Sequence, residues 1–132
     1  MRRASEHAEQ CAVIDWWRLA CHAYKLPESA LFAIPNGAHL AGDAKGRAIK
    51  MANLKRAGLR PGIPDLCLAV PRWRVDSGAL YVEMKRRPNK PGPEQESAIF
   101  NLRRNGYHVC ICYSADEAIQ AIKGYLHDFA PR

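Results

Sequence analysis

The chain has 132 residues, of which 48% are hydrophobic and 25% are charged. This composition is close to the globular average and excludes a disordered or fibrous protein, and the length suits one domain, which we expect to span residues 1–132. Lys and Arg outnumber Asp and Glu by 20 to 13, which suits an anionic partner such as nucleic acid, although many soluble proteins are equally basic.

The first predicted element is a helix from Ser5 to about Tyr24. Ser5 suits the N-cap position, because its hydroxyl can accept a hydrogen bond from the first turn. Apolar residues recur at helical spacing at Val13, Trp17, Ala20 and Tyr24. Glu6 and Gln10 continue this stripe toward the N-terminus, so polar groups extend the face that packs on the core.

A short strand and a basic helix are expected next. The apolar run Leu31–Ile34 is followed by Pro35-Asn36-Gly37, a turn signal, and this pattern predicts a buried strand. Residues 43–57 are rich in Ala, Lys, Arg, Met and Leu and precede Gly58, which is typical of a helix and its C-terminal glycine. This second helix is strongly basic.

A hairpin is predicted in the middle of the chain. Residues 61–64, Pro-Gly-Ile-Pro, cannot be helical and lead into a strand over residues 65–70. Residues 79–85 form the next strand. The segment between the two is short enough for a hairpin loop, so we expect the strands to be antiparallel neighbours.

The last third of the chain predicts helix, strand and helix. A proline and early acids are typical of a helix that begins at Pro93, and this helix runs to Asn105. Residues 107–113 form a strand, and Ser114 caps a final helix that ends near His127. The predicted order is α-β-α-β-β-α-β-α, an α/β fold in which helices flank a mixed sheet.

Cysteine usage and hydropathy restrict the class of protein further. The five cysteines form no C-x-x-C pair, so we expect reduced core residues rather than a zinc site or a disulfide framework. The sequence has no run of about 18 apolar residues, and its N-terminus leads into a polar helix pattern rather than a signal peptide. We therefore expect an intracellular protein that does not contact a membrane. The five histidines are scattered, and we assign them no catalytic role.

The strand over residues 79–85 carries the strongest chemical signal. Period-two alternation places Glu83 and Lys85 on one face and Met84 on the other. Asp65, on the antiparallel neighbour, can approach Glu83. Mg²⁺ binds through one or two carboxylates and keeps several waters, so Asp65, Glu83 and the Met84 carbonyl would form a partial metal shell. Lys85 would either position the attacking water or stabilise the charge that develops on the phosphate.

These three side chains also have an ordinary structural explanation. Asp65 follows a proline and is otherwise a turn residue, while Glu83 and Lys85 are otherwise a weak ion pair on a solvated strand face. Packing does not explain a charged pair next to the apolar run Leu80–Val82, and this favours the catalytic interpretation.

Four polar residues on other elements are further candidates. Glu6 and Glu9 are alternative metal ligands from the first helix. The stripe shared with Gln10 favours Glu6, a different helix rotation favours Glu9, and either is otherwise a solvated acid. Gln95 would reach the phosphate or a metal-bound water from the start of the third helix, or it faces solvent. Asn36 is a candidate DNA contact or only a turn residue.

Basic residues flank the proposed site on both sides. They suit phosphate contacts that position a duplex without reading its sequence, although each alone is more simply a solvated surface residue. Before the Asp65 strand they are Lys45, Arg47, Lys50, Lys55, Arg56 and Arg60, and after Lys85 they are Arg86, Arg87 and Lys90.

The same residues carry a family resemblance. Gly62 to Asp65 has the pattern G-x-P-D, and Glu83 to Lys85, eighteen positions later, has the pattern E-x-K, which together resemble the PD-(D/E)XK nuclease motif. With IPNG from Ile34, KRAGLRPGIPDL from Lys55, YVEMKRR from Tyr81 and PEQ from Pro93, the chain resembles the VRR-NUC family, the virus-type replication-repair nucleases. The resemblance extends from the E-x-x-x-Q of the first helix to the final helix.

The resemblance implies a restriction-endonuclease-like core and hydrolysis of DNA phosphodiester bonds with Mg²⁺ or Mn²⁺, at branched structures such as four-way (Holliday) junctions. Members of this size resemble phage and bacterial proteins that act as homodimers, which implies a homodimer in the cytoplasm of a bacterium or a phage-infected host. Trp16 and Trp17 cannot both face the core, so one lies at such an interface or is partly exposed beside a loop. The alternatives are a catalytically silent DNA-binding module, against which the complete motif argues, and an RNA endonuclease.

Overall fold

The computed structural model describes residues 4–36 and 40–129, so Gly37 of the predicted turn lies outside the described residues. The helices and strands follow the predicted order. They are α1 (Glu6–Ala20), β1 (Leu31–Ala33), α2 (Ala44–Arg56), β2 (Leu66–Leu68), β3 (Leu80–Met84), α3 (Pro93–Arg104), β4 (His108–Cys112) and α4 (Ala115–Tyr125). Three short 3-10 helices join them: η1 (Cys21–Tyr24), η2 (Glu28–Ala30) and η3 (Trp73–Val75).

Side-chain caps explain where three of the helices begin. Ser5, Asp43 and Ser114 are the N-cap residues of α1, α2 and α4, and each accepts a hydrogen bond from the backbone N–H three residues later. These bonds satisfy donors that the first helical turn leaves unpaired. The predicted caps at Ser5 and Ser114 are therefore confirmed.

The four strands form one mixed sheet in the order β1-β2-β3-β4. β1 and β2 are antiparallel, β2 and β3 form the predicted antiparallel hairpin, and β4 runs parallel to β3. Leu66 is paired with Val82 in the hairpin. One step further along the same register, Asp65 lies opposite Glu83.

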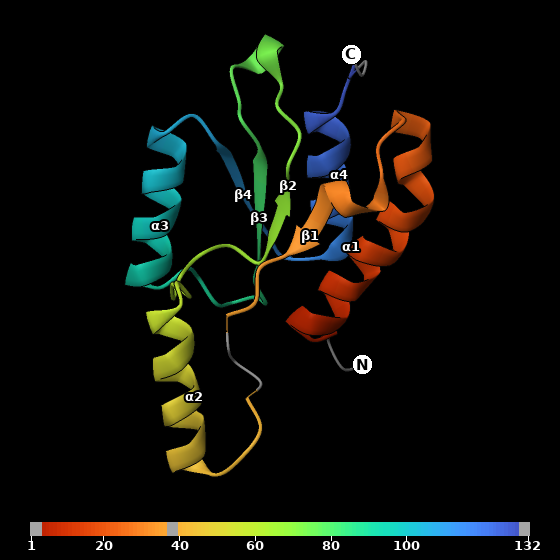
Figure 1. Cartoon of the computed structure of the whole chain (residues 1–132). Helices are drawn as coiled ribbons and strands as arrows, with labels where there is room; N and C mark the ends of the chain where they lie inside the picture. Colours follow the sequence, from red (N-terminus) through yellow and green to blue (C-terminus); the bar gives the residue numbers. More distant parts are fainter. Residues whose placement is uncertain (1–3, 37–39, 130–132) are drawn as a thin grey trace.

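Helices cover the sheet on both sides, so the α/β class is confirmed. Figure 1 shows α3 on one side of the sheet and α1 with α4 on the other. Alternate residues of β3, namely Leu80, Val82 and Met84, join the core between the sheet and these last two helices. Glu83 therefore faces the opposite side, toward α3.

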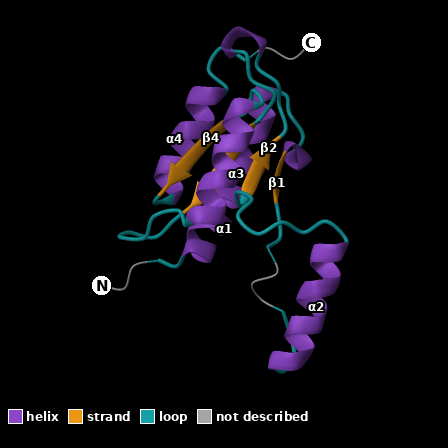
Figure 2. Cartoon of the chain, turned by 90° about the vertical axis from the view of Figure 1, so that its left-hand side faces the viewer, coloured by secondary structure: helices purple, strands orange, loops and turns teal. Residues whose placement is uncertain are grey.

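Helix α2 stands outside these layers. Figure 2 shows it projecting away from the sheet, and none of its residues is buried. The structure thus gives α2 no share of the core, and its charged surface is open to solvent. Among the described residues, no helix has the length and apolar character that crossing a membrane requires.

Three expectations about burial need correction or refinement. β1 is an edge strand in which Phe32 is 44% exposed, so it is not the fully buried strand that its apolar run predicted. Cys11 is exposed on α1 and is not a core residue, whereas the other cysteines are buried or half-buried, and none of the five forms a disulfide. Trp17 is fully buried, and Trp16 is half-buried against the core.

Candidate active site

The carboxylates of Asp65 and Glu83 meet where β2 begins and β3 ends. Asp65 Oδ2 accepts a hydrogen bond from the backbone N–H of Met84 at 2.8 Å, which ties the carboxylate to the neighbouring strand. The Asp65 carbonyl accepts from the backbone N–H of Ile34 at 2.8 Å. Glu83 is only 3% exposed, so it is not a solvated strand residue. The ordinary explanation of Glu83 as half of a surface ion pair is excluded.

Gln95 holds one oxygen of Glu83 in place. Its Nε2 donates to Glu83 Oε1 at 3.1 Å, while its own Oε1 accepts from the backbone N–H of Gly92 at 3.0 Å. Because a backbone N–H can only donate, the amide oxygen of Gln95 must face Gly92, and the amide nitrogen must face Glu83. The residue that caps α3 therefore also orients a buried carboxylate, so Gln95 does not simply face solvent.

The second oxygen of Glu83 has no donor. Glu83 Oε2 is buried and lacks a hydrogen-bond partner, and the neighbouring side chain is the Asp65 carboxylate, which is itself an acceptor. A buried acceptor beside a half-buried one needs a proton or a cation between them. Oxygen donors of this kind suit Mg²⁺ or Mn²⁺. Among the described residues no three His, Cys, Asp or Glu side chains surround one position.

The electrostatics of the pair follow from this arrangement. Burial and the adjacent Asp65 carboxylate raise the pKa of Glu83 from 4.5 to about 8. Burial likewise raises the pKa of Asp65, against the opposing hydrogen bond from Met84. The positive charge of Lys85 favours the ionised form of both carboxyls, and it opposes the increase in their pKa without cancelling it. The pair therefore holds a proton more strongly than ordinary carboxyls do.

Gly62 of the G-x-P-D motif brings α3 against the strand pair. It has φ +90°, and a Cβ at this position would lie 2.6 Å from the carbonyl oxygen of Glu94. A side chain would therefore meet both backbone strain and a backbone clash. Its absence lets the loop before β2 lie directly on the first turn of α3, which carries Gln95. The sequence places this glycine in the motif and in the non-helical segment 61–64, but does not reveal its contact with α3.

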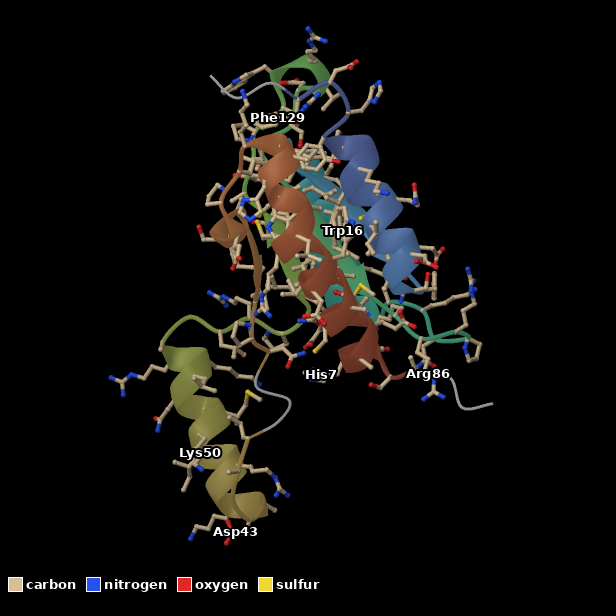
Figure 3. The ribbon with its side chains drawn as sticks, turned by 90° about the vertical axis from the view of Figure 1, so that its right-hand side faces the viewer. His7, Trp16, Asp43, Lys50, Arg86 and Phe129 are labelled. Carbon is tan, nitrogen blue, oxygen red and sulfur yellow. The ribbon has the colours of Figure 1, made fainter. Side chains whose placement is uncertain are left out.

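A cleft of about 530 Å³ opens beside Asp65. Its lining comes from the start of α1, the end of β1 and the β3–α3 loop, and includes Glu6, Gln10, Asn36 and Arg86. Glu6 Oε1 accepts a hydrogen bond from the backbone N–H of Arg86 at 3.1 Å. Figure 3 shows His7 and Arg86 at the same end of α1, the end farther from Phe129. The cleft therefore brings polar groups from distant segments to one side of Asp65.

The two acids of α1 lie in different surroundings. Glu6 lines the cleft, and its charge raises the pKa of both Asp65 and Glu83. Glu9 turns the other way, and its Oε2 accepts from the backbone N–H of Ala115 at 2.6 Å at the start of α4. The rotation of α1 thus brings Glu6, and not Glu9, to the carboxylate pair.

The basic candidates are all exposed, but some of them have local partners. Lys50 Nζ donates to the Ala41 carbonyl at 2.7 Å, and Arg47 donates to the Gly42 carbonyl, so both hold the segment before α2. Arg87 lies over the Tyr113 ring, with its guanidinium carbon 4.2 Å from the ring centroid. The remaining basic residues are exposed on or after α2 and in the β3–α3 loop: Lys45, Lys55, Arg56, Arg60, Arg86 and Lys90.

Comparison with known proteins agrees with this geometry. The VRR-NUC domain model matches residues 1–116. A solved structure described as a VRR_NUC domain protein superposes with a TM-score of 0.73 at 20% sequence identity, covering 96% of this chain and 91% of that one, so the fold is the same. Among curated proteins, none matches the sequence. The chain therefore belongs to the VRR-NUC family of PD-(D/E)XK-type nucleases.

Proposed function

We propose that this chain is a metal-dependent endodeoxyribonuclease whose active site is built on Asp65, Glu83 and Lys85. The observation that carries the proposal is the buried Glu83 Oε2, which has no donor and lies beside a second carboxylate. A buried acceptor without a donor, beside a second carboxylate, is costly for the protein alone, and a divalent cation would stabilise it. The whole of residues 1–132 would act as one nuclease domain.

Asp65, Glu83 and the Met84 carbonyl would hold Mg²⁺ or Mn²⁺. Glu6, which lines the cleft, would be a further metal ligand. Glu9 instead accepts a hydrogen bond from the backbone N–H of Ala115 at the start of α4. When bound, the metal would supply Lewis-acid activation of water and of the scissile phosphate. The fit rests on the all-oxygen donor set.

The remaining residues would prepare the site for hydrolysis. Gln95 donates to Glu83 Oε1, which leaves the buried Oε2 available to a metal. Lys85 brings a positive charge to the carboxylates and would orient the attacking water or stabilise the charge on the phosphate. Gly62 keeps Gln95 close by allowing α3 to lie on the loop before Asp65.

DNA would reach the site across two basic surfaces, the exposed face of α2 and the β3–α3 loop. Both consist of exposed cations suited to phosphate contacts, which position a duplex without reading its sequence. Asn36, which lines the cleft, would contact the strand nearest to Asp65.

We further propose that the protein acts in the cell on branched DNA, such as a four-way junction, as a homodimer. One site can cut one strand, and a symmetric junction offers two equivalent strands, so a two-fold symmetric pair of subunits matches that substrate. Trp16 does not carry this interface, because it is half-buried against the core of its own chain.

The test is cleavage of a labelled four-way junction and of a matched linear duplex with Mg²⁺ or Mn²⁺, by wild type and by Lys85→Ala. Paired symmetric nicks in the junction that disappear in the variant are expected. Equal cutting of both substrates would leave a general nuclease. Binding without cutting by wild type would overturn the proposal in favour of a silent DNA-binding module, and a preference for an RNA duplex would favour an RNA endonuclease.

A further inference from the structure

A second groove lies at the opposite end of the sheet from the carboxylates. It has a volume of about 670 Å³ and is formed by the tip of the β2–β3 hairpin, the start of β4 and the end of α4. Leu80, which lines the groove, precedes Glu83 by three residues, so the groove begins about 10 Å along β3 from Glu83. In Figure 3, Phe129 lies near the top, and His7 and Arg86 lie lower, at the opposite end of α1.

The guanidinium of Arg72 is the unusual feature of this groove. Arg72 lines it, yet is only 6% exposed, and its Nη1 is buried without a hydrogen-bond partner. Its Nη2 donates to the His127 carbonyl at 2.7 Å, and the Phe129 ring lies 5.5 Å from its central carbon. None of the ion pairs among the described residues involves Arg72. A positive charge is therefore held at the groove wall without an acid to neutralise it.

Further cations line the same groove. Arg74 and Arg103 belong to its walls, and neither forms an ion pair among the residues that the structure describes. The one acid in the lining is Asp128, whose carboxylate lies 3.2 Å from the Nε2 of His127. Three arginines against a single carboxylate give the groove a net positive charge, which favours an anionic ligand.

Aromatic side chains accompany these cations. Tyr107, His108 and Tyr125 line the groove, and the rings of the last two meet edge to face at 5.8 Å. Trp73 lies between Arg72 and Arg74 in the sequence of the hairpin tip; it is outside the groove lining and is 69% exposed. An exposed tryptophan flanked by arginines is suited to stacking on a base while its neighbours contact phosphates.

We infer that this groove binds an unpaired nucleic-acid strand. Arg72, Arg74 and Arg103 would attract its phosphates, and Trp73 would stack on a base. An acidic peptide would match the positive charge but would make no comparable use of the exposed indole, so a single strand is the better fit. The inference rests on the proposed action on DNA and specifies the substrate: duplex at the carboxylates and an unpaired arm at the hairpin end.

The test is binding of labelled oligothymidylate to the whole protein in EDTA, followed by anisotropy. Arg74→Glu is compared with Arg104→Glu, a matched control, since Arg104 is exposed on α3 outside the groove and the change in net charge is identical. We expect Arg74→Glu to weaken binding about tenfold more than the control, and Trp73→Ala to weaken it by a similar factor. Oligothymidylate should also quench tryptophan fluorescence in wild type and not in Trp73→Phe.

Two results would overturn the inference: equal losses in Arg74→Glu and Arg104→Glu, or stronger binding of polyglutamate than of oligothymidylate with the same number of charges. Because EDTA prevents metal-dependent cutting, the outcome does not depend on the active site. Groove-dependent binding by a protein that cuts no DNA would support the groove and contradict only the proposed nuclease. Normal cutting with equal losses would contradict only the groove.

Discussion

Glu83 and the basic residues of α2 lie in opposite surroundings, although we propose that both meet the same phosphodiester backbone. Glu83 is 3% exposed, and one of its oxygens is held by Gln95. By contrast, α2 has no buried residue and stands apart from the sheet. The contrast teaches that a group that polarises a bond must be desolvated and fixed, whereas a group that attracts a phosphate needs only charge and access.

The largest effect is expected from the carboxylate pair. Asp65→Asn or Glu83→Gln should reduce the rate of DNA cleavage by about a thousandfold, or about 4 kcal/mol in activation free energy, because either change removes a metal ligand. DNA affinity in EDTA should be retained. Single-turnover rates and anisotropy measure the two quantities. A variant that cuts DNA at the wild-type rate would show that the altered carboxylate is not needed for the chemistry.

The second prediction concerns pH. Since the pKa of Glu83 is raised from 4.5 to about 8, its protonation stabilises the folded state below pH 4.5, and this stability is lost as pH rises through 8. Glu83→Gln stays neutral, so in metal-free buffer its stability should rise relative to wild type across that window, by at most about 1.4 kcal/mol for each pH step of one. Urea unfolding at several pH values measures the difference.

A curve for Glu83→Gln that runs parallel to that of wild type over the same pH range would mean that Glu83 is solvated in solution. Addition of Mg²⁺ at high pH should stabilise wild type and leave Glu83→Gln nearly unchanged, because a ligand that binds only the folded state raises stability by mass action.

A smaller effect is expected at Gly62. Gly62→Ala should destabilise the protein by about 2–3 kcal/mol, because it combines backbone strain with a clash against the first turn of α3. Gly58→Ala is the matched control: its φ is +114°, and no atom lies within 4 Å of the added Cβ, so only strain of about 1 kcal/mol remains. Thermal unfolding compares the two. Equal losses would show that α3 does not lie on the Gly62 loop.

The smallest effects should come from the open surface. Lys55→Ala and Arg56→Ala should each weaken duplex binding and reduce the slope of log affinity against log salt by about 0.9 per lost phosphate contact. The rate of cleavage at saturating DNA should be unaffected. A thousandfold loss of this rate, with affinity intact, would show that α2 takes part in the cleavage step itself, as we propose for Glu83.

Much of the fold could be predicted because the relevant signals are local. Turn residues and periodicity predicted the α-helices and β-strands in order, and period-two alternation placed Glu83 and Met84 on opposite faces of one strand. The short hairpin loop predicted the antiparallel pairing that sets Asp65 opposite Glu83. What failed is the burial of β1, because an apolar run does not reveal whether a strand lies at the edge of a sheet.

The sequence by itself therefore determined the element order, the family motif and the identity of the carboxylate pair, since each depends on neighbours along the chain. Only the tertiary structure decided that Glu83 Oε2 lacks a donor, that α1 turns Glu6 rather than Glu9 toward the site, and that Gly62 contacts α3. The cationic groove at the hairpin end also depends on the tertiary structure, because its lining residues come from separate segments between positions 72 and 128. Such features depend on how packed elements rotate and approach one another, and the periodicity of the sequence does not predict these rotations and distances.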